Sequence, residues 1–176
     1  MLVKCYGLYW RPELVNWGRQ AYGGRGELIG VFTKDRRRFR RDFWEEIGVY
    51  VLYDNYRIVY IGRTTKERLG SRLRSHWNKR GERWDSFSWY GLRAPSLTKD
   101  RLLSVGKRKF SGDDTIRALE AILIEVCDPL LNRRHERIKD AIRARQAPPE
   151  GLPKDEAEML REIYERIVSD KSQEAV

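Results

Sequence analysis

The feature that most constrains the fold is a pair of β-rich runs joined by a short polar turn. Residues 48–53 have the sequence GVYVLY, residues 57–62 have the sequence RIVYIG, and Asp54-Asn55-Tyr56 separates them. Valine, isoleucine and tyrosine favour strands, and aspartate and asparagine favour the tight turn of a hairpin. The sequence therefore predicts an antiparallel β-hairpin with a tyrosine in each strand.

A basic amphipathic helix is predicted directly after the hairpin. Leu69, Leu73 and Trp77 recur at helical spacing within residues 65–79, while arginine and lysine occupy the other faces. Gly81 is a typical helix stop signal. The expected order is therefore strand, turn, strand, helix.

Two further elements complete the predicted core. Residues 87–92 (FSWYGL) have the composition of a third strand. Residues 111–114 (SGDD) are a capping cluster for a helix over residues 115–127, which is apolar on most of its circumference and is expected in the core. Residues 93–112 are expected to form an irregular loop with a short helical piece at residues 101–105.

The net charge of the chain indicates the kind of partner that it binds. The 176 residues include 36 Lys and Arg against 26 Asp and Glu, which gives a formal net charge of +10. Such a balance favours a polyanionic partner, above all nucleic acid, although many basic proteins bind none. With 40% hydrophobic residues, the chain can bury a core and fold as a domain.

Targeting signals are not recognisable in the sequence. No apolar run approaches the ~20 residues that span a bilayer, so no membrane partner is expected. The N-terminus lacks the residue order of a secretory signal, and Cys5 and Cys127 form no CxxC pair. The expected location is the reducing cytoplasm, in association with DNA. His76 and His135 do not stand at zinc-ligand spacing from the cysteines, which disfavours a structural zinc.

The basic run KDRRRFRR over residues 34–41 follows a predicted short strand at residues 27–32. One interpretation of the run is a solvated loop. The other is an edge that follows the phosphates of a nucleic acid, with Phe39 packed or stacked among the arginines. The loop at residues 93–109 is a second candidate for such contacts.

One carboxylate is a candidate metal ligand. Phosphodiester hydrolysis needs an activated water and stabilisation of extra negative charge; a divalent metal can supply both, and a carboxylate must hold it. Glu120 stands on a largely apolar helix, where an unpartnered buried carboxylate would cost several kcal/mol. A structural pairing with arginine, or a helix face that meets water, would explain Glu120 without a metal.

Tyr50, Tyr60, Arg72 and His76 are the other candidates for chemistry. Arg72 and His76 stand four positions apart, so they share one face of the predicted helix. Arginine and tyrosine can donate hydrogen bonds to developing negative charge. Taken singly, the tyrosines are ordinary packing residues, Arg72 an ordinary basic surface residue and His76 a half-buried ring.

The ordered set resembles the GIY-YIG nuclease superfamily, which includes homing endonucleases, repair nucleases and restriction enzymes. The resemblance implies an α/β (α+β) fold with a small three-stranded, mainly antiparallel sheet flanked by helices. It makes residues 46–133 the nuclease core, residues 1–45 a basic and aromatic extension packed on it, and residues 134–176 a helical extension. It rests on GVY, YIG, Arg72, His76, Glu120 and Asn132.

The resemblance implies a role for each matching residue. Tyr50 and Tyr60 would form the floor of the active site, and Tyr50 would orient or deprotonate the attacking water. Arg72 would contact the scissile phosphate and stabilise its transition-state charge. His76 would orient groups or relay a proton. Glu120 would be the sole protein ligand of one Mg²⁺.

The cofactor, the partner and the remaining contacts follow from the same resemblance. Mg²⁺ is the expected cofactor, with Mn²⁺ able to substitute, and DNA is the expected partner. Asn132 would hold the site together through side-chain hydrogen bonds, and Arg63, directly after YIG, would contact a phosphate. The remaining expected DNA contacts are the arginines of the basic run, Arg36, Arg37, Arg38, Arg40 and Arg41.

Three functions are compatible with these residues. The first is a Mg²⁺-dependent endonuclease that cuts duplex DNA, restriction-like where it is sequence-specific. The second is a structure-specific repair or mobile-element nuclease, disfavoured because no helix-hairpin-helix, zinc-finger or RING-like module follows the core. The third is a non-catalytic nucleic-acid-binding module on the same scaffold.

The C-terminal region has three parts. Residues 133–146 are a basic helical candidate, residues 147–153 a proline-rich linker, and residues 154–170 an acidic amphipathic helix. The apolar stripe of that helix would dock on the domain, or serve a partner or a second copy. Because one active site cuts one strand at a time, double-strand cleavage would need a homodimer on DNA, sequential nicking or transient pairing.

Overall fold

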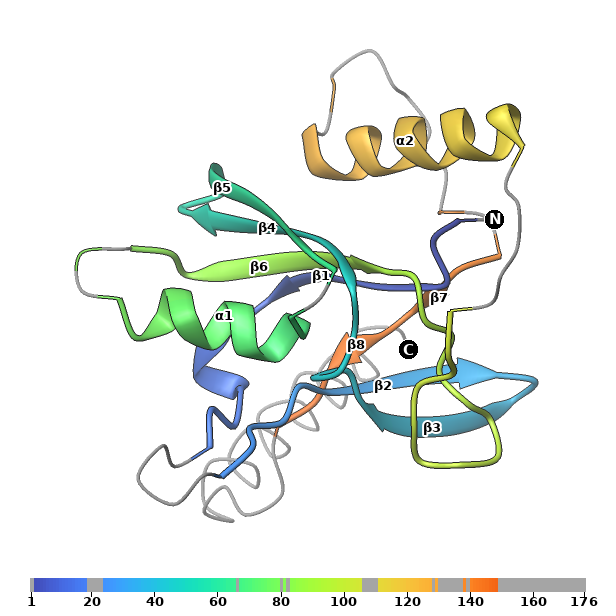
Figure 1. Ribbon diagram of the computed structural model, residues 1–176, viewed down its shortest axis with the longest axis horizontal. Helices are drawn as coiled ribbons and strands as arrows, with labels where there is room; N and C mark the ends of the chain where they lie inside the picture. Colours follow the sequence, from blue (N-terminus) through green and yellow to red (C-terminus); the bar gives the residue numbers. More distant parts are fainter. Residues whose placement is uncertain are drawn as a thin grey trace, which may run out of the picture.

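The chain belongs to the α+β class, as the computed structural model shows (Figure 1). Two β-sheets and two α-helices make up the regular structure of the described residues, together with a short 3-10 helix at Pro12–Leu14. The residues that the structure describes are 2–18, 24–65, 67–79, 81, 83–105, 111–127, 129, 138 and 140–148.

A five-stranded sheet forms the centre of the molecule. Its strands are β1 (Cys5–Trp10), β4 (Gly48–Asp54), β5 (Arg57–Thr64), β6 (Ser86–Gly91) and β7 (Ile142–Arg143). Their order across the sheet is β5-β4-β6-β1-β7, and every pairing is antiparallel except that of β1 with β7. The predicted hairpin and third strand are thus confirmed as β4, β5 and β6.

The expectation of a three-stranded sheet was wrong. A sheet that ended at β6 would leave a row of unpaired backbone N–H and C=O groups along that strand. β1 satisfies these groups, with Cys5 opposite Gly91 and Trp10 opposite Phe87. Parts of both expected extensions, residues 1–45 and 134–176, therefore belong to the same sheet as the hairpin.

The basic run over residues 34–41 belongs to a β-hairpin and not to an irregular loop. Lys34 ends β2 (Ile29–Lys34), and residues 37–41 lie in β3 (Arg37–Asp42), which pairs antiparallel with β2. The turn residues Asp35 and Arg36 have φ values of 49° and 61°, which a tight two-residue hairpin turn requires. β8 (Arg145–Gln146) pairs on the other side of β2 and completes a small second sheet.

Two other predicted helical segments differ from the structure. Where the structure describes the basic helical candidate over residues 133–146, it has the strands β7 and β8, because their backbones pair with β1 and β2. Residues 101–105 form no helix; instead Leu102 makes an isolated antiparallel bridge with Pro95. The acidic helix predicted over residues 154–170 lies outside the described residues.

The helices α1 (Leu69–Trp77) and α2 (Gly112–Cys127) lie on opposite sides of the five-stranded sheet, as Figure 1 shows. Both confirm predicted helices, although α1 begins later than expected. Ser111 caps α2 as predicted, because its Oγ accepts the Asp114 N–H and donates to the Asp114 carboxylate, both at 3.1 Å.

The start of α1 is fixed by the backbone just before β4. The N–H of Leu69 donates to the carbonyl of Glu46 at 2.9 Å, and the N–H of Gly70 donates to the carbonyl of Trp44 at 3.0 Å. These bonds satisfy helix N–H groups that no side chain caps. Gly70 approaches the Trp44 indole so closely that a Cβ would overlap the ring. The helix is therefore held at a defined position against the sheet.

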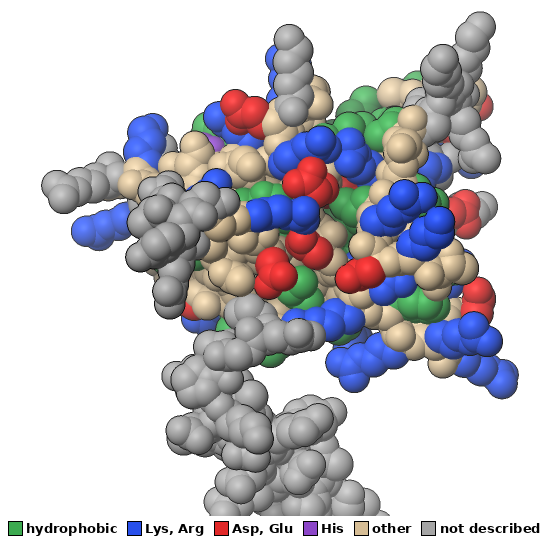
Figure 2. Space-filling view, turned by 60° about the horizontal axis from the view of Figure 1, so that its bottom comes forward, with side chains coloured by type: hydrophobic (Ala, Val, Ile, Leu, Met, Phe, Trp, Pro, Cys, Tyr) green, Lys and Arg blue, Asp and Glu red, His purple; other side chains and the backbone are tan. Residues whose placement is uncertain are grey.

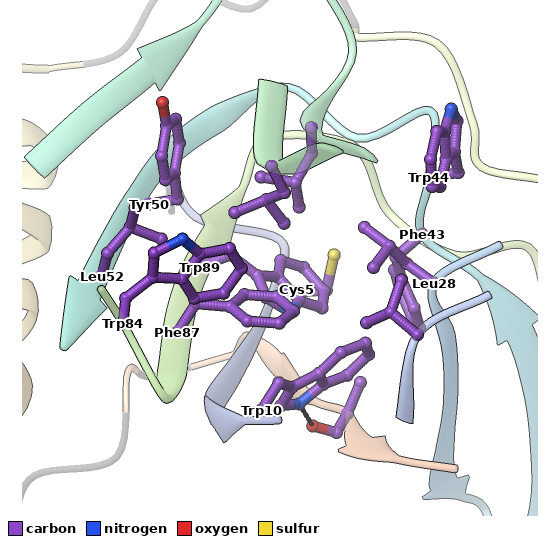
Figure 3. Packing of buried hydrophobic residues seen from close by; sticks show 14 of the residues in the cluster. Cys5, Trp10, Leu28, Phe43, Trp44, Tyr50, Leu52, Trp84, Phe87 and Trp89 are labelled. Carbon is purple, nitrogen blue, oxygen red and sulfur yellow. Dashed lines mark hydrogen bonds between the residues drawn. The ribbon is translucent and has the colours of Figure 1, made fainter. Parts of the chain in front are cut away.

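Alternation along β4 distributes its residues between two cores. Tyr50 and Leu52 join an aromatic cluster on the α1 side, whereas Val51 and Tyr53 join a cluster that packs against α2. Figure 3 shows the first cluster, in which the Trp10 and Trp89 rings meet edge to face with centroids 5.3 Å apart. Tyr50 lies at its margin, with the hydroxyl pointing away from the other rings.

The prediction that α2 is a core helix was half right. Ala118 and Ile124 are buried, but Ile116, Leu119 and Leu123 are 65%, 53% and 59% exposed. One side of the helix packs on the sheet, and the opposite side carries an exposed apolar stripe. None of the described helices is both long and apolar enough to cross a bilayer.

Candidate active site

Tyr50 and His76 form the centre of the candidate site. The Tyr50 side chain leaves β4 on the α1 face of the sheet, and His76 lies in the last turn of α1. The Tyr50 hydroxyl lies 2.9 Å from His76 Nε2, within hydrogen-bonding distance. Both side chains are buried. Strand and helix are thus joined by a polar contact at the edge of an aromatic core.

Tyr60 covers this pair from the solvent side. Its ring lies 4.6 Å from the His76 ring and 6.0 Å from the Tyr50 ring, measured between centroids, and its side chain is partly exposed. The register explains the contact, because Tyr50 pairs with Gly62, and Tyr60 stands two residues from Gly62 on the same face of β5. Tyr50 and Tyr60 therefore share one surface, as the resemblance implied.

Gly62 makes room for the Tyr50 ring. A Cβ at Gly62 would lie 2.7 Å from Cε1 of Tyr50 and closer still to its Cζ and hydroxyl oxygen. Real side chains essentially never approach so closely. The glycine of the second tripeptide therefore has a steric role, which is to let the Tyr50 phenol lie flat across β5 beside His76.

Arg72 stands one turn before His76 on α1, and its guanidinium interacts with the hydroxyls of both tyrosines. These hydroxyls, Tyr50 first, raise the pKa of Arg72 above its already high usual value, so it stays cationic. Arg72 Nε also lies 3.5 Å from Oε2 of Glu67. The sequence did not single out Glu67; the signal was a lone carboxylate directly before a basic helix.

Tyr50 is neutral at physiological pH. Burial raises its pKa to about 12, and the Arg72 guanidinium offsets only part of that effect. A neutral phenol donates to His76 Nε2 in the tautomer that carries its proton on Nδ1. In that state the Tyr50 oxygen can accept a hydrogen bond from the Arg72 guanidinium, and His76 can receive the Tyr50 proton.

Glu120 does not join this cluster. α2 packs through Ala121 and Ile122 on the sheet face that carries Val51 and Tyr53, opposite the face of Tyr50. Glu120 is exposed on the outer side of the helix, in an apolar groove of about 610 Å³. The sequence left three explanations for Glu120: a metal ligand, a structural partner of an arginine, or a residue on a helix face that meets water. The structure shows the last of these.

A further predicted contact residue, Arg63, does not face the tyrosines. Arg63 is exposed on β5 and pairs with Val49, so its side chain lies on the face opposite the neighbouring Gly62 and Tyr50. Asn132 lies outside the described residues. The structure therefore brings four of the six expected catalytic residues together.

The side chains around Tyr50 and His76, in the positions that the structure gives them, do not fit a metal ion. Glu67 is the carboxylate that the structure brings to the cluster, and it pairs with Arg72. Elsewhere in the described ranges, no group of three or more His, Cys, Asp and Glu side chains could hold a metal. A hydrated Mg²⁺ with a single ligand would need a carboxylate facing the tyrosines, which Glu120 does not provide here.

The arginines of β3 divide into two kinds. Arg37 and Arg38, with Arg36 in the turn, are exposed. Arg40 and Arg41 are partly tied to the protein: Arg40 donates to the Pro148 carbonyl at 3.0 Å, and Arg41 donates to the Ser96 carbonyl at 2.9 Å. Figure 2 shows lysine and arginine side chains spread widely over one face of the molecule.

Phe39 is partly buried and packs against another ring of the small sheet. Its ring stacks on Phe32 with centroids 5.3 Å apart, and the Arg41 guanidinium lies 5.5 Å from its centroid. Of the two alternatives for this ring, packing is the one that the structure shows.

Comparison of the chain with protein-family models, with curated proteins and with solved structures finds no match.

Proposed function

We propose that this protein is a nuclease that hydrolyses phosphodiester bonds in duplex DNA, with Tyr50, Tyr60, Arg72 and His76 in its active site. The observation that carries the proposal is the 2.9 Å contact between the Tyr50 hydroxyl and His76 Nε2, with Tyr60 and Arg72 beside it. Four polar side chains from two strands and a helix meet at one edge of the sheet. Packing alone does not require that combination.

The roles follow from charge and exposure. Arg72 binds the scissile phosphate and stabilises the extra negative charge of the transition state, because it stays cationic. Tyr50 is fully buried, so a water reaches its oxygen only when Tyr60 moves aside. Such a water can lose its proton to Tyr50 as Tyr50 passes its own proton to His76 Nε2. Tyr60, which is partly exposed, orients the phosphate or the water by hydrogen bonding.

Mg²⁺, or Mn²⁺ in its place, is the proposed cofactor; it would stabilise charge and lower the pKa of a bound water. The resemblance to GIY-YIG nucleases gives Glu120 as its ligand, whereas the described placement of α2 does not support that residue. The steps assigned to Tyr50, His76 and Arg72 do not depend on which carboxylate holds the ion.

A cleavage assay tests the proposal. Supercoiled plasmid, branched oligonucleotides and flapped oligonucleotides are incubated with Mg²⁺, Mn²⁺ or EDTA. We expect nicking that EDTA abolishes and that falls about 100-fold or more in Arg72→Gln and in Tyr50→Phe. Arg117→Gln is the matched control, because Arg117 is exposed on α2, away from the cluster. Full activity of both site variants would refute the assignment of the site.

Glu120→Gln in the same assay decides whether Glu120 is the carboxylate that holds the metal ion. Retained cleavage is the result that the described placement of Glu120 predicts. Loss of cleavage with DNA binding intact would show that Glu120 acts in the reaction, and that α2 meets the metal in a different arrangement. Discrete plasmid fragments would indicate a sequence-specific enzyme, and cutting confined to branches would indicate a structure-specific one.

One observation favours a second function, a non-catalytic nucleic-acid-binding module. The tyrosine cluster holds a cation, Arg72, but its nearby carboxylate is engaged with that cation. Such a site can bind a phosphate without cutting it. DNA binding without cleavage in every metal tested would select this function.

Cutting both strands would require two active sites or two successive events. A homodimer on DNA is the proposed arrangement for double-strand cleavage. Sedimentation of the protein with and without a duplex would detect it.

A further inference from the structure

A second cationic surface lies apart from the tyrosine cluster, on the small sheet. β2 and β3 and the segment at residues 140–145 line a groove of about 730 Å³. Among the described residues that line it, four side chains are basic and one, Asp140, is a carboxylate. We call it the basic groove and define it by Lys34, Arg38, Arg143 and Arg145.

Strand pairing explains why these residues converge. Arg38 of β3 pairs with Thr33 of β2, and Arg145 of β8 pairs with Val31 on the other side of the same strand. Thr33 and Val31 stand two residues apart, so their partners share one face of the sheet. The cations of β3 and β8 are more than one hundred positions apart in the sequence, and only the central strand brings them together.

The four cations are free to meet a ligand. Lys34, Arg38, Arg143 and Arg145 are all exposed, and none forms an ion pair with a carboxylate in the described part of the chain. Four positive charges against Asp140 leave the groove strongly cationic. A concave cationic surface attracts a polyanion and releases its counterions on binding.

The part of the groove that the structure describes offers cations but no exposed ring. The aromatic residues that line it there are Tyr6 and Phe32, and they are only 1% and 4% exposed. Proteins that hold single strands without sequence preference place bases on exposed aromatic faces. A groove that carries arginines and a lysine but no exposed aromatic ring is suited to binding phosphates. A duplex displays phosphates continuously along its outside.

We propose that the basic groove binds the phosphate backbone of duplex DNA, independently of sequence. The choice of DNA rests on the proposed function, and the groove would hold the duplex outside the site of cleavage. Arg143 and Arg145 thereby become nucleic-acid contacts, although the sequence placed them in a helix and gave them no role.

The test measures binding without cleavage. A fluorescently labelled duplex of mixed sequence is titrated in EDTA, and the dissociation constant is measured by anisotropy from 50 to 200 mM salt. A plot of the logarithm of the association constant against the logarithm of the salt concentration has a negative slope. Each lost phosphate contact reduces the magnitude of that slope by about 0.9. We therefore expect Arg143→Gln/Arg145→Gln to reduce the magnitude of the slope by about 1.8, and Lys34→Gln/Arg38→Gln to do the same.

The control is Arg57→Gln/Arg117→Gln, which removes two exposed arginines elsewhere on the described surface and should leave the slope closer to that of the wild type. Thermal melting checks that each variant folds. Equal slopes in the groove variants and the control would overturn the proposal. Tighter binding of a single strand, or of duplex RNA, would overturn the choice of duplex DNA.

The failure of this proposal and that of the proposed function are distinguishable. Slope changes in the groove variants without cleavage in any metal would keep the basic groove and remove the nuclease. Cleavage lost in Arg72→Gln, with unchanged slopes in the groove variants, would keep the nuclease and remove the groove.

Discussion

Replacing Gly62 by alanine tests the steric basis of the candidate site. The added Cβ would lie 2.7 Å from Cε1 of Tyr50 and closer to Cζ and the hydroxyl oxygen, where ordinary contact begins at 3.4 Å. The Tyr50 ring is fully buried and cannot swing freely into solvent. Relief requires β5 to move from β4 or the phenol to move from His76. Overpacking of this kind costs about 1–3 kcal/mol.

Urea unfolding followed by tryptophan fluorescence measures the effect. In thermal melts the same loss lowers the midpoint by about 2–4 °C per kcal/mol for a chain of this size. Gly112→Ala is the matched control, because a Cβ at Gly112 meets no atom within 4 Å. Gly62→Ala should also reduce cleavage as far as Tyr50→Phe does, since both remove the Tyr50 hydroxyl from His76. Equal stability and activity in the two alanine variants would refute this account of Gly62.

Three further predictions concern pH and capping. Burial raises the pKa of Glu46 to about 7, so the stability that protonated Glu46 contributes is fully present below about pH 4.5 and is lost as pH rises through 7. Urea unfolding from pH 4 to 8 should therefore show the free energy of unfolding fall by on the order of 3 kcal/mol. Glu46→Gln should flatten this decline. A decline of the same size in Glu46→Gln would assign it to other groups. Folding raises the pKa of Tyr50 to about 12, so stability relative to Tyr50→Phe should be constant below about pH 10 and fall from there toward pH 12; a constant difference across that range would contradict it. Ser111→Ala removes the cap of α2 and should cost about 1 kcal/mol in urea unfolding, whereas Ser111→Asp should restore most of it.

The elements that local chemistry dictates were predictable from the sequence. β4, β5, β6 and α1 all appear near their expected residues. The hairpin turn shows part of the reason: Asn55 takes a φ of 49°, which asparagine adopts readily. Tyr56 takes a φ of 65°, where glycine is the usual residue. Arg72 and His76 share a helix face because four residues span about one helical turn.

The parts of the site that came together depend on short-range geometry. Tyr50 and Tyr60 are joined by a tight hairpin, so their common face follows from the register of two neighbouring strands. His76 stands on the helix that follows directly, and its 2.9 Å contact with Tyr50 closes a compact unit. Glu120 is separated from that unit by β6 and a long loop. The helix α2 has apolar residues on two sides, and their spacing in the sequence does not show which side meets the sheet.

The sequence by itself determined a basic chain with a hairpin that carries a tyrosine in each strand and with an amphipathic helix after it, because propensity and periodicity act over a few residues. Only the tertiary structure decided that β1 and β7 extend the sheet, that α2 turns Glu120 to solvent, and that β8 brings Arg145 beside the cations of β3. Such long-range pairings depend on which backbone edges and apolar faces remain unsatisfied after the local elements form. No window of neighbouring residues contains that information.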